Sequence, residues 1–446
     1  MKEMNIVRRI SISIKHMNAR LYVSLLVLGL CPTIYTTVRV FFVGQLPGEY
    51  SYSIAGQLSW VNLLYEILSE AIILPLFFFI GKVYLDKKEF ANRMRTGLLV
   101  SFVVYIVFSA SIVICAEELL RLMAVDVSII EESAQYIRIE SMANIFLMMF
   151  NYISVGLVTL GKSRYVYTIT GVKLVMCVVL DVFMVSTLPV SLNLGVNGIA
   201  FTNIIVNLTL LVISILILRR EGINLLTKDK LEFSWMKGFL KIGGISGLES
   251  FVRNVAYMLM ISRMVNIVGE QGTYWVANNF IWGWLLLPVL QLGELIKREV
   301  ATDESAVRTN TIGYLAVTIF ICIGWCATIP LWKIFMKNIL GYSDVDKLYE
   351  LVILLLGFYV LYAVQNVFDA TFYGLGKTKY MLFESVVTNT FYYGGAYIFY
   401  VTGIWTPSLV GIALLFGIGN AIDSIVSFVA YAYLLKKNSI NILQVL

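Results

Sequence analysis

The chain is poor in charged residues and has almost no histidine. Only 14% of its 446 residues are Asp, Glu, Lys or Arg, against roughly 25% in an ordinary soluble domain. The single histidine, His16, lies near the N-terminus, and the five cysteines lie within or at the ends of apolar runs. We therefore expect no metal or haem site, no disulfide framework and no cofactor. With no nucleophile–base constellation and no sizeable soluble segment, we do not expect an enzyme.

Long apolar runs dominate the chain, and hydrophobic residues make up 59% of it. A helix of about 20 apolar residues spans the ~30 Å hydrocarbon core of a bilayer, so the sequence predicts an all-α polytopic membrane protein. No small-residue cleavage site follows the first run, which we interpret as a span rather than a signal peptide. Pro32, Pro75 and Pro288 lie inside spans and are expected to permit bends. The twelve predicted transmembrane helices are 21–43, 56–82, 96–116, 131–160, 164–188, 195–219, 239–265, 273–297, 309–332, 348–375, 378–402 and 408–435.

The sequence contains an internal repeat. The segment Leu160–Tyr165 (LGKSRY) returns 215 positions later as Leu375–Tyr380 (LGKTKY). A near-constant offset with unchanged order indicates two similar halves, so we predict two pseudo-symmetric six-helix bundles. The predicted organisation is a segment 1–20, a first bundle 21–219, a linker 220–238, a second bundle 239–435 and a tail 436–446. The other matching pairs are Arg39 with Arg253, Trp60 with Trp275, Pro75 with Pro288, and Gly198 with Gly411.

Lysine and arginine alternate between the connections. Connections 44–55, 189–194 and 403–407 contain neither residue, whereas the even-numbered connections and the linker are basic; only 333–347 breaks the pattern. Because basic loops stay on the cytoplasmic side, we expect a cell-membrane protein with both termini in the cytoplasm and repeats related by an axis along the membrane normal. The net charge of +6 is spread over these loops rather than gathered in a patch, so no nucleic-acid partner is expected.

Two glutamates stand inside the second predicted span. Glu66 and Glu70 are four residues apart and therefore share one helix face. Ionisable groups at membrane depth are costly and usually face a bundle interior or a watery cavity. Two neighbouring acids suit an exchangeable proton, which makes both residues candidates for ion coupling. The alternative is that they pair with Arg39 on the preceding span and only fix helix packing.

Two arginines occupy corresponding places in the two repeats. Arg253 is the repeat partner of Arg39, and Glu249 lies four residues before it. A local ion pair between Glu249 and Arg253 is one interpretation. The other is that the two arginines face the seam between the halves, which would suit an anionic substrate.

Further acidic residues lie in the fifth and last three spans. Asp181 lies deep in the fifth span, and Asp369, Glu384 and Asp423 lie in spans ten, eleven and twelve. Because Asn366 and Asn420 flank two of these acids, we predict a polar pocket in the C-terminal half. For each residue alone, a satisfied contact between helices is the alternative.

Several short motifs, with the twelve spans in two halves, resemble the multidrug and toxic compound extrusion (MATE) family. That family belongs to a larger group that includes oligosaccharide-lipid flippases. The resemblance implies a V-shaped pair of bundles around a central cleft, alternating access, and export driven by a Na⁺ or H⁺ gradient. The motifs are Phe41–Gly44 (FFVG), Leu180–Asp181, Leu194–Ala200 (LGVNGIA), Pro288 and Tyr373–Lys379 (YGLGKTK).

The coupling residues of the family are only partly matched. Asp181 matches the fifth-span aspartate, but Arg39 stands where the family often has a first-span acid, and Cys177 stands where an asparagine is expected. In the seventh span, where some members have a glutamate, this chain has Arg253 or Asn254, with Glu249 one turn away. The resemblance therefore implies a cation site that is either altered or absent, and the arginine favours an unusual, anionic cargo.

We interpret the chain as a secondary active exporter of a small molecule, working in the bilayer as a monomer. The alternative is a flippase for a lipid-linked or other anionic saccharide, since paired arginines would suit a pyrophosphate. A passive channel is a third interpretation, which saturable, gradient-driven flux would exclude. The cargo and the coupling ion are left open. The candidates are Asp181, Glu66, Glu70 and Asp369 for ion coupling, and Arg39, Arg253 and Glu249 for the substrate cleft.

Overall fold

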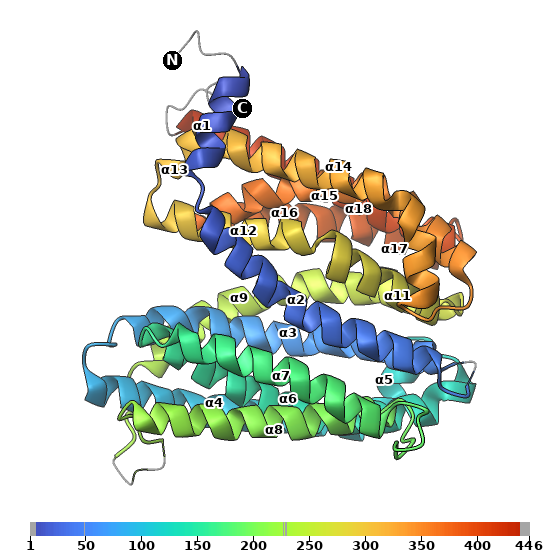
Figure 1. Cartoon of the computed structure of the whole chain (residues 1–446), viewed down its shortest axis with the longest axis horizontal. Coiled ribbons are helices and arrows are strands. Elements are labelled where there is room, and N and C mark those ends of the chain that lie inside the picture. The colour runs from blue at the N-terminus through green and yellow to red at the C-terminus, as the bar shows by residue number, and fades with distance from the viewer. Residues whose placement is uncertain (1–5, 49, 226, 228–229, 438–446) are drawn as a thin grey trace. The chain divides into compact units, whose positions relative to one another are not determined.

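The computed structural model describes residues 6–48, 50–225, 227 and 230–437, and within these ranges the chain forms helices and no strands (Figure 1). Parts of the predicted segment 1–20, linker 220–238 and tail 436–446 therefore lie outside the described residues. The helices are α1 (Ile6–His16), α2 (Ala19–Gly44), α3 (Ser51–Gly81), α4 (Lys87–Ile114), α5 (Ala116–Leu122), η1 (Val127–Ile129), α6 (Ile130–Thr159), α7 (Ser163–Met184), α8 (Asn197–Arg220), α9 (Met236–Tyr257), η2 (Met258–Ser262), α10 (Arg263–Ile267), α11 (Gln271–Phe280), η3 (Ile281–Leu285), α12 (Leu287–Thr302), α13 (Ala306–Thr309), α14 (Thr311–Asn338), α15 (Val345–Gly374), α16 (Lys379–Val386), η4 (Val387–Tyr393), α17 (Gly394–Val401) and α18 (Leu409–Lys437).

The helices account for every predicted span. Among the described residues, nine helices are long and apolar enough to cross a membrane, and α11–η3 with α12 forms a bent pair that makes a tenth. Two continuous helical runs, α9–η2–α10 and α16–η4–α17, coincide with the predicted spans 239–265 and 378–402. All twelve predictions therefore correspond to a helix or a helical run, and the all-α fold class is confirmed.

Bends and irregular turns gather in the second half of the chain. The axis turns by 52° between Gln271–Leu285 and Leu287–Thr302, and Pro288 lies in the first turn of α12. A proline is tolerated there because a first-turn N–H has no partner within the helix. This bend was expected from the sequence, whereas Pro32 and Pro75 lie inside the continuous helices α2 and α3. The elements η2, η3 and η4 are π-helical turns, a feature found often at functional sites.

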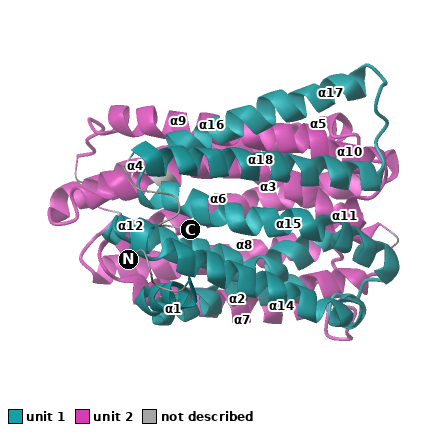
Figure 2. Cartoon of the chain, turned by 90° about the horizontal axis from the view of Figure 1, so that it is seen from above, with its two compact units in different colours: residues 1–37, 276–446 teal, residues 38–275 magenta. Residues whose placement is uncertain are grey.

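Packing divides the chain into two compact units (Figure 2). Unit 2 is residues 38–275, and unit 1 combines residues 1–37 with 276–446. The boundaries fall inside α2 and α11, so each of these helices contributes to both units. The predicted bundles 21–219 and 239–435 were defined by the sequence repeat, whereas the two units are defined by the contacts between helices, so their boundaries differ. Helix α9 begins the second repeat, yet it packs on α3 within unit 2.

Glycines explain why α9 packs so closely on α3. A side chain at Gly243 would meet the carbonyl oxygen of Ala71, and one at Gly247 would lie 2.9 Å from the Ala71 Cβ. Small residues let helix backbones approach within a membrane. The rest of unit 2 is organised around α6, which packs on α3, α4 and α8.

Unit 1 has an aromatic core between α12, α14, α15 and α18. The rings of Phe368 and Tyr431 stack with centroids 4.6 Å apart, and the Tyr431 hydroxyl lies 3.1 Å from that of Thr311. The N-terminal helix α1 is attached to this unit through Ser13, whose hydroxyl accepts a hydrogen bond from the backbone N–H of Gly313.

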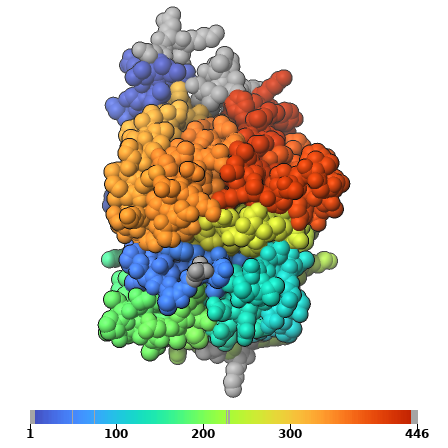
Figure 3. Space-filling model, turned by 90° about the vertical axis from the view of Figure 1, so that its right-hand side faces the viewer, coloured from blue at the N-terminus to red at the C-terminus, as the bar shows by residue number. Residues whose placement is uncertain are grey.

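The connections of unit 2 lie at its ends in the alternation predicted from the sequence. The odd-numbered connections after α2, after α4 and after α7 share one end of the unit and are visible together in Figure 3. The basic connection 82–86 between α3 and α4 lies at the opposite end (Figure 1). The three odd-numbered connections and this basic connection therefore lie at opposite ends of the unit.

Candidate functional site

Arg39 and Asp181 form a buried ion pair in unit 2. Arg39 lies five residues before the end of α2, and Asp181 lies three residues before the end of α7. The Nε of Arg39 is 2.7 Å from Oδ2 of Asp181, and Nη2 is 3.5 Å from Oδ1. The Asp181 side chain is 0% exposed and that of Arg39 is 11% exposed. The negative charge of Asp181 is therefore balanced by a cation that belongs to the protein.

Glu140, which the sequence analysis did not single out, lies beside this pair. It is 6% exposed, and the side-chain amide of Asn203 on α8 donates a hydrogen bond of 2.8 Å to its Oε1. Its other oxygen, Oε2, has no hydrogen-bond partner in the described part of the chain. Glu140 also interacts electrostatically with Arg39 and Asp181. Unit 2 thus contains a buried carboxyl group besides that of Asp181, and one of its oxygens accepts no hydrogen bond from the described residues.

A signal for Glu140 was present in the sequence. Ser133, Glu140 and Asn144 are spaced i, i+7 and i+11 and so lie on one face of α6. Asn203 and Asn207 are four apart on α8, which packs against that helix. A polar stripe on each of two apolar spans indicates that the stripes face each other.

Four side chains form a second charged group in unit 2, here called the Arg253 cluster. The Nη2 of Arg253 lies 2.7 Å from Glu70 and 3.5 Å from Glu66, and its Nη1 lies 3.4 Å from Glu249. The local pairing of Glu249 with Arg253 is therefore confirmed. Both glutamates of α3 also pair with Arg253, while Arg39 pairs with Asp181. Three carboxylates facing one guanidinium leave two formal negative charges in the cluster.

The Arg253 cluster is at mid-helix and partly accessible. Glu66 has fifteen residues of α3 on either side. Its side chain is 45% exposed, against 21% for Glu70 and 19% for Glu249. The cluster is thus a partly open negative site, with Glu66 at the middle of α3.

Unit 1 contains a group of three acids, here called the carboxylate cluster. It consists of Asp369 on α15, Glu384 on α16 and Asp423 on α18, and neutral donors hold the two aspartates. The side-chain amide of Gln365 donates to both aspartates, at 3.1 Å to Asp369 and 2.6 Å to Asp423. Ser427 donates to Asp369 at 2.7 Å. Asp369 and Asp423, expected to lie in a polar region of the C-terminal half, are thus brought together by Gln365, whereas Asn366 donates to the carbonyl of Val289.

Glu384 is the most enclosed member of the carboxylate cluster. It is 3% exposed, its carboxyl interacts with those of Asp369 and Asp423, and its Oε1 has no hydrogen-bond partner among the described residues. Within those residues none of the three acids forms an ion pair. Isolated charges in a low-dielectric interior are strongly disfavoured. The cluster therefore needs protons or a bound cation to be stable.

The described residues contain no group of three or more His, Cys, Asp or Glu side chains arranged to hold a metal ion. The candidate residues thus fall into separate groups: the Arg39–Asp181 pair with Glu140, the Arg253 cluster, and the carboxylate cluster. Both arginines predicted to shape a cleft lie in unit 2. Asp369 lies in unit 1, where its neighbours Gln365 and Ser427 were not foreseen.

Comparisons with known proteins agree with this architecture. Residues 29–183 match the MatE family model. The chain matches a solved structure described as the inward-facing conformation of a multidrug resistance MATE family transporter of the MOP superfamily, with 17% identity, a TM-score of 0.74, and coverage of 97% of this chain and 99% of that chain. It also matches a MOP superfamily transporter from Pyrococcus furiosus, described as having a binding pocket of reverse polarity (18% identity, TM-score 0.71, 96% and 98% covered). A third match is a mutant MATE transporter of Vibrio cholerae (14% identity, TM-score 0.71, 96% and 98% covered). No curated protein matches in sequence.

Proposed function

We propose that this multi-pass membrane protein is a secondary active transporter. The premise is its resemblance to the MATE transporters, both in the family-model match and in the fold. The protein exports a small molecule by alternating access, and an inward H⁺ or Na⁺ gradient drives it. We place it in the cell membrane, as a monomer with both termini in the cytoplasm, needing no cofactor besides the coupling ion and performing no enzymatic reaction.

The observation that carries the proposal is the carboxylate cluster of unit 1. Asp369 and Asp423 are bound by amide and hydroxyl donors, and none of the three acids has an ion-paired cation in the described ranges. Such a group takes up a proton or a cation when it is closed off from water and releases it when water returns. Alternating access supplies that change, so we assign the coupling ion to this cluster, with Asp369 at its centre.

In unit 2, Asp181, Glu66 and Glu70 are weaker candidates for coupling. Asp181 is already neutralised by Arg39 at 2.7 Å, and replacing this internal cation by an external one would break a buried pair. Glu66 and Glu70 share Arg253. They remain coupling candidates, because the Arg253 cluster keeps two formal negative charges.

The charges also favour a cationic cargo over an anionic one. A partly open cluster of three carboxylates and one guanidinium attracts organic cations. A flippase for an anionic saccharide would require Arg39 and Arg253 to exchange their carboxylate partners for the cargo phosphate.

Flux in proteoliposomes tests the proposal. The purified chain is reconstituted, a proton or sodium gradient is imposed separately, and uptake of ethidium, an organic cation, is followed alongside uptake of a short-chain lipid-linked saccharide. We expect saturable ethidium uptake driven by one of the two gradients. Ethidium exclusion with movement of the saccharide would instead establish the flippase, and non-saturating flux would establish a channel.

A further inference from the structure

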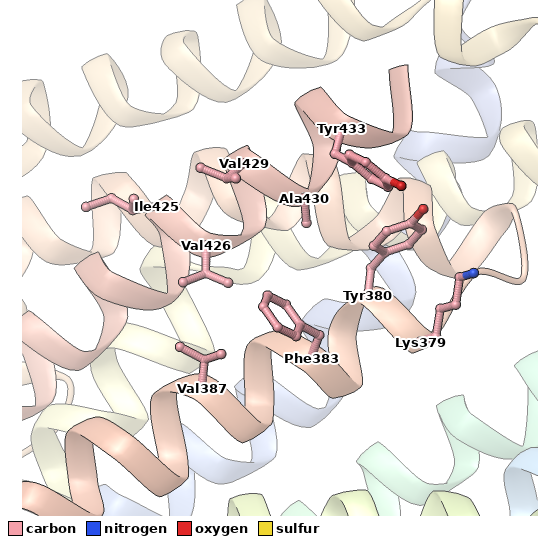
Figure 4. Close-up of a pocket in the computed structure, with 9 residues that line it drawn as sticks. All are labelled: Lys379, Tyr380, Phe383, Val387, Ile425, Val426, Val429, Ala430 and Tyr433. Atoms are coloured by element: carbon pink, nitrogen blue, oxygen red, sulfur yellow. The ribbon is translucent and has the colours of Figure 1, made fainter. Parts of the chain in front are cut away.

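A groove runs between α18 and the helical run α16–η4 in unit 1. Its volume is about 510 Å³, within the range of roughly 300–1,000 Å³ typical of small-ligand sites. Figure 4 shows its side chains projecting from both helices into one elongated space. They are Lys379, Tyr380, Phe383, Val387, Ile425, Val426, Val429, Ala430 and Tyr433.

Most of the groove is apolar and open to the surroundings of the protein. Phe383 is 59% exposed, Ile425 64% and Val429 60%. On a helix that crosses a bilayer, exposed apolar side chains contact lipid chains rather than water. The long, apolar wall made by these residues therefore suits a hydrocarbon chain lying along it.

One end of the groove is polar. The rings of Tyr380 and Tyr433 lie with centroids 6.4 Å apart, beside Lys379 at the same end of the groove (Figure 4). Neither hydroxyl makes a hydrogen bond in the structure as described. Lys436 and Lys437 follow Tyr433 at i+3 and i+4, so they continue the same face of α18 by one turn.

The charge at this end is of one sign. Lys377 precedes α16, Lys379 is the first residue of α16 and lines the groove, and Lys436 and Lys437 end α18. No acidic residue occurs in 376–383 or 429–437. Among the described residues none of the four lysines forms an ion pair. The polar end thus offers unbalanced ammonium groups and two free phenol donors.

We propose that this groove is a binding site for an anionic phospholipid. One acyl chain lies along Phe383, Ile425 and Val429, and the headgroup phosphate meets the lysines and the two tyrosine hydroxyls. Lysine binds phosphate as a point charge, and basic residues at a membrane surface attract anionic lipids. A zwitterionic lipid would fill the same wall but would leave the excess positive charge uncompensated. The site does not depend on what the protein transports.

Native mass spectrometry of the full-length protein tests this site. The chain is purified in detergent with equal amounts of dioleoyl phosphatidylglycerol and dioleoyl phosphatidylethanolamine, which share acyl chains and differ in charge. We expect a retained one-to-one complex with the anionic lipid. Because one basic residue near the surface is worth ≈ 1 kcal/mol, Lys379→Gln should lower the preference about fivefold. Lys82→Gln, which removes a lysine at the end of α3, is the matched control and should change nothing.

A second pair of variants tests the apolar wall. Val429→Trp fills the groove and should abolish retention of the lipid, whereas Ile398→Trp places the same side chain at an exposed position of α17 outside the groove and should not. Both positions are exposed, so the variants are expected to fold, as a single monodisperse elution peak verifies. Equal retention of the two lipids, or insensitivity to both Lys379→Gln and Val429→Trp, would overturn the proposal. Displacement of the lipid by ethidium would also overturn it, because the groove would then be a cargo site.

Discussion

The guanidinium of Arg39 donates to the carboxylate of Asp181 across 2.7 Å in the interior of unit 2. The resemblance to the MATE family implies an acid where Arg39 stands. In this chain that place supplies a cation, and the fifth-span aspartate is neutralised by the protein itself. The three carboxyl groups of unit 1, by contrast, have no such partner among the described residues, which makes them the better site for a coupling ion.

The Arg39–Asp181 pair should behave as a unit in stability measurements. Removing one partner of a buried ion pair costs about 3–5 kcal/mol, because the other charge is left uncompensated. We expect Arg39→Gln and Asp181→Asn each to lower the midpoint of thermal unfolding in detergent strongly. The double variant should be more stable than either single variant. Additive losses in the double variant would show that the two charges are independent.

The contacts of Arg253 predict a ranking of variants. Arg253→Gln should destabilise the protein most, because three carboxylates lose their counter-ion. Glu70→Gln removes a charged hydrogen bond of 2.7 Å, worth about 1.5–3 kcal/mol. Glu66→Gln removes a 3.5 Å contact of a 45% exposed side chain, worth about 0–1 kcal/mol. Thermal unfolding of the three variants measures the order, and a larger loss for Glu66→Gln than for Glu70→Gln would contradict it.

Glu140 should tolerate neutralisation. Its Oε2 has no donor to lose, and a glutamine oxygen can still accept the bond from Asn203. We therefore expect the unfolding free energy of Glu140→Gln to lie within about 1 kcal/mol of wild type, whereas Asn203→Ala should cost about 1–3 kcal/mol by leaving a buried acceptor unsatisfied. If Glu140→Gln is the more damaging change, Glu140 is ionised and balances Arg39.

Two adjacent glycines of α9 give a matched pair for its packing. Gly243→Ala places a Cβ against the carbonyl oxygen of Ala71, whereas nothing lies within 4 Å of a Cβ at Gly244. Overpacking of this kind costs about 1–3 kcal/mol, while Gly244→Ala should be neutral or stabilising by up to about 1 kcal/mol. Equal unfolding midpoints for the two variants would show that α9 does not pack on α3.

Much of the fold followed from the sequence. Apolar runs located all twelve predicted helices or helical runs, and Pro288 located a bend, because both depend on local composition and backbone chemistry. The sequence repeat did not reveal that α9 packs with α3. That packing depends on the close approach of Gly243 to Ala71, which only three-dimensional contacts determine.

The candidate sites followed less completely. Spacing identified Glu66 with Glu70 and Glu249 with Arg253, since neighbours on one helix face are fixed by the helical period. The helical period does not determine which residues of different helices meet, so the pairing of Arg39 with Asp181 was not predicted. Glu140 was missed because a single acid in an apolar run attracts no attention until Asn203 is placed opposite it.

The central claim is that the coupling ion binds the carboxylate cluster of unit 1, and transport by Asp369→Asn tests it most directly. Two activities are measured in proteoliposomes. One is the accumulation of ethidium driven by an ion gradient, and the other is the exchange of ethidium across the membrane at equal concentrations on both sides. The exchange needs no ion gradient. Asp344→Asn, on the same helix but at its N-cap, is the control. We expect Asp369→Asn to lose at least tenfold in accumulation while exchange continues, and Asp344→Asn to retain both. Undiminished accumulation by Asp369→Asn would contradict the assignment.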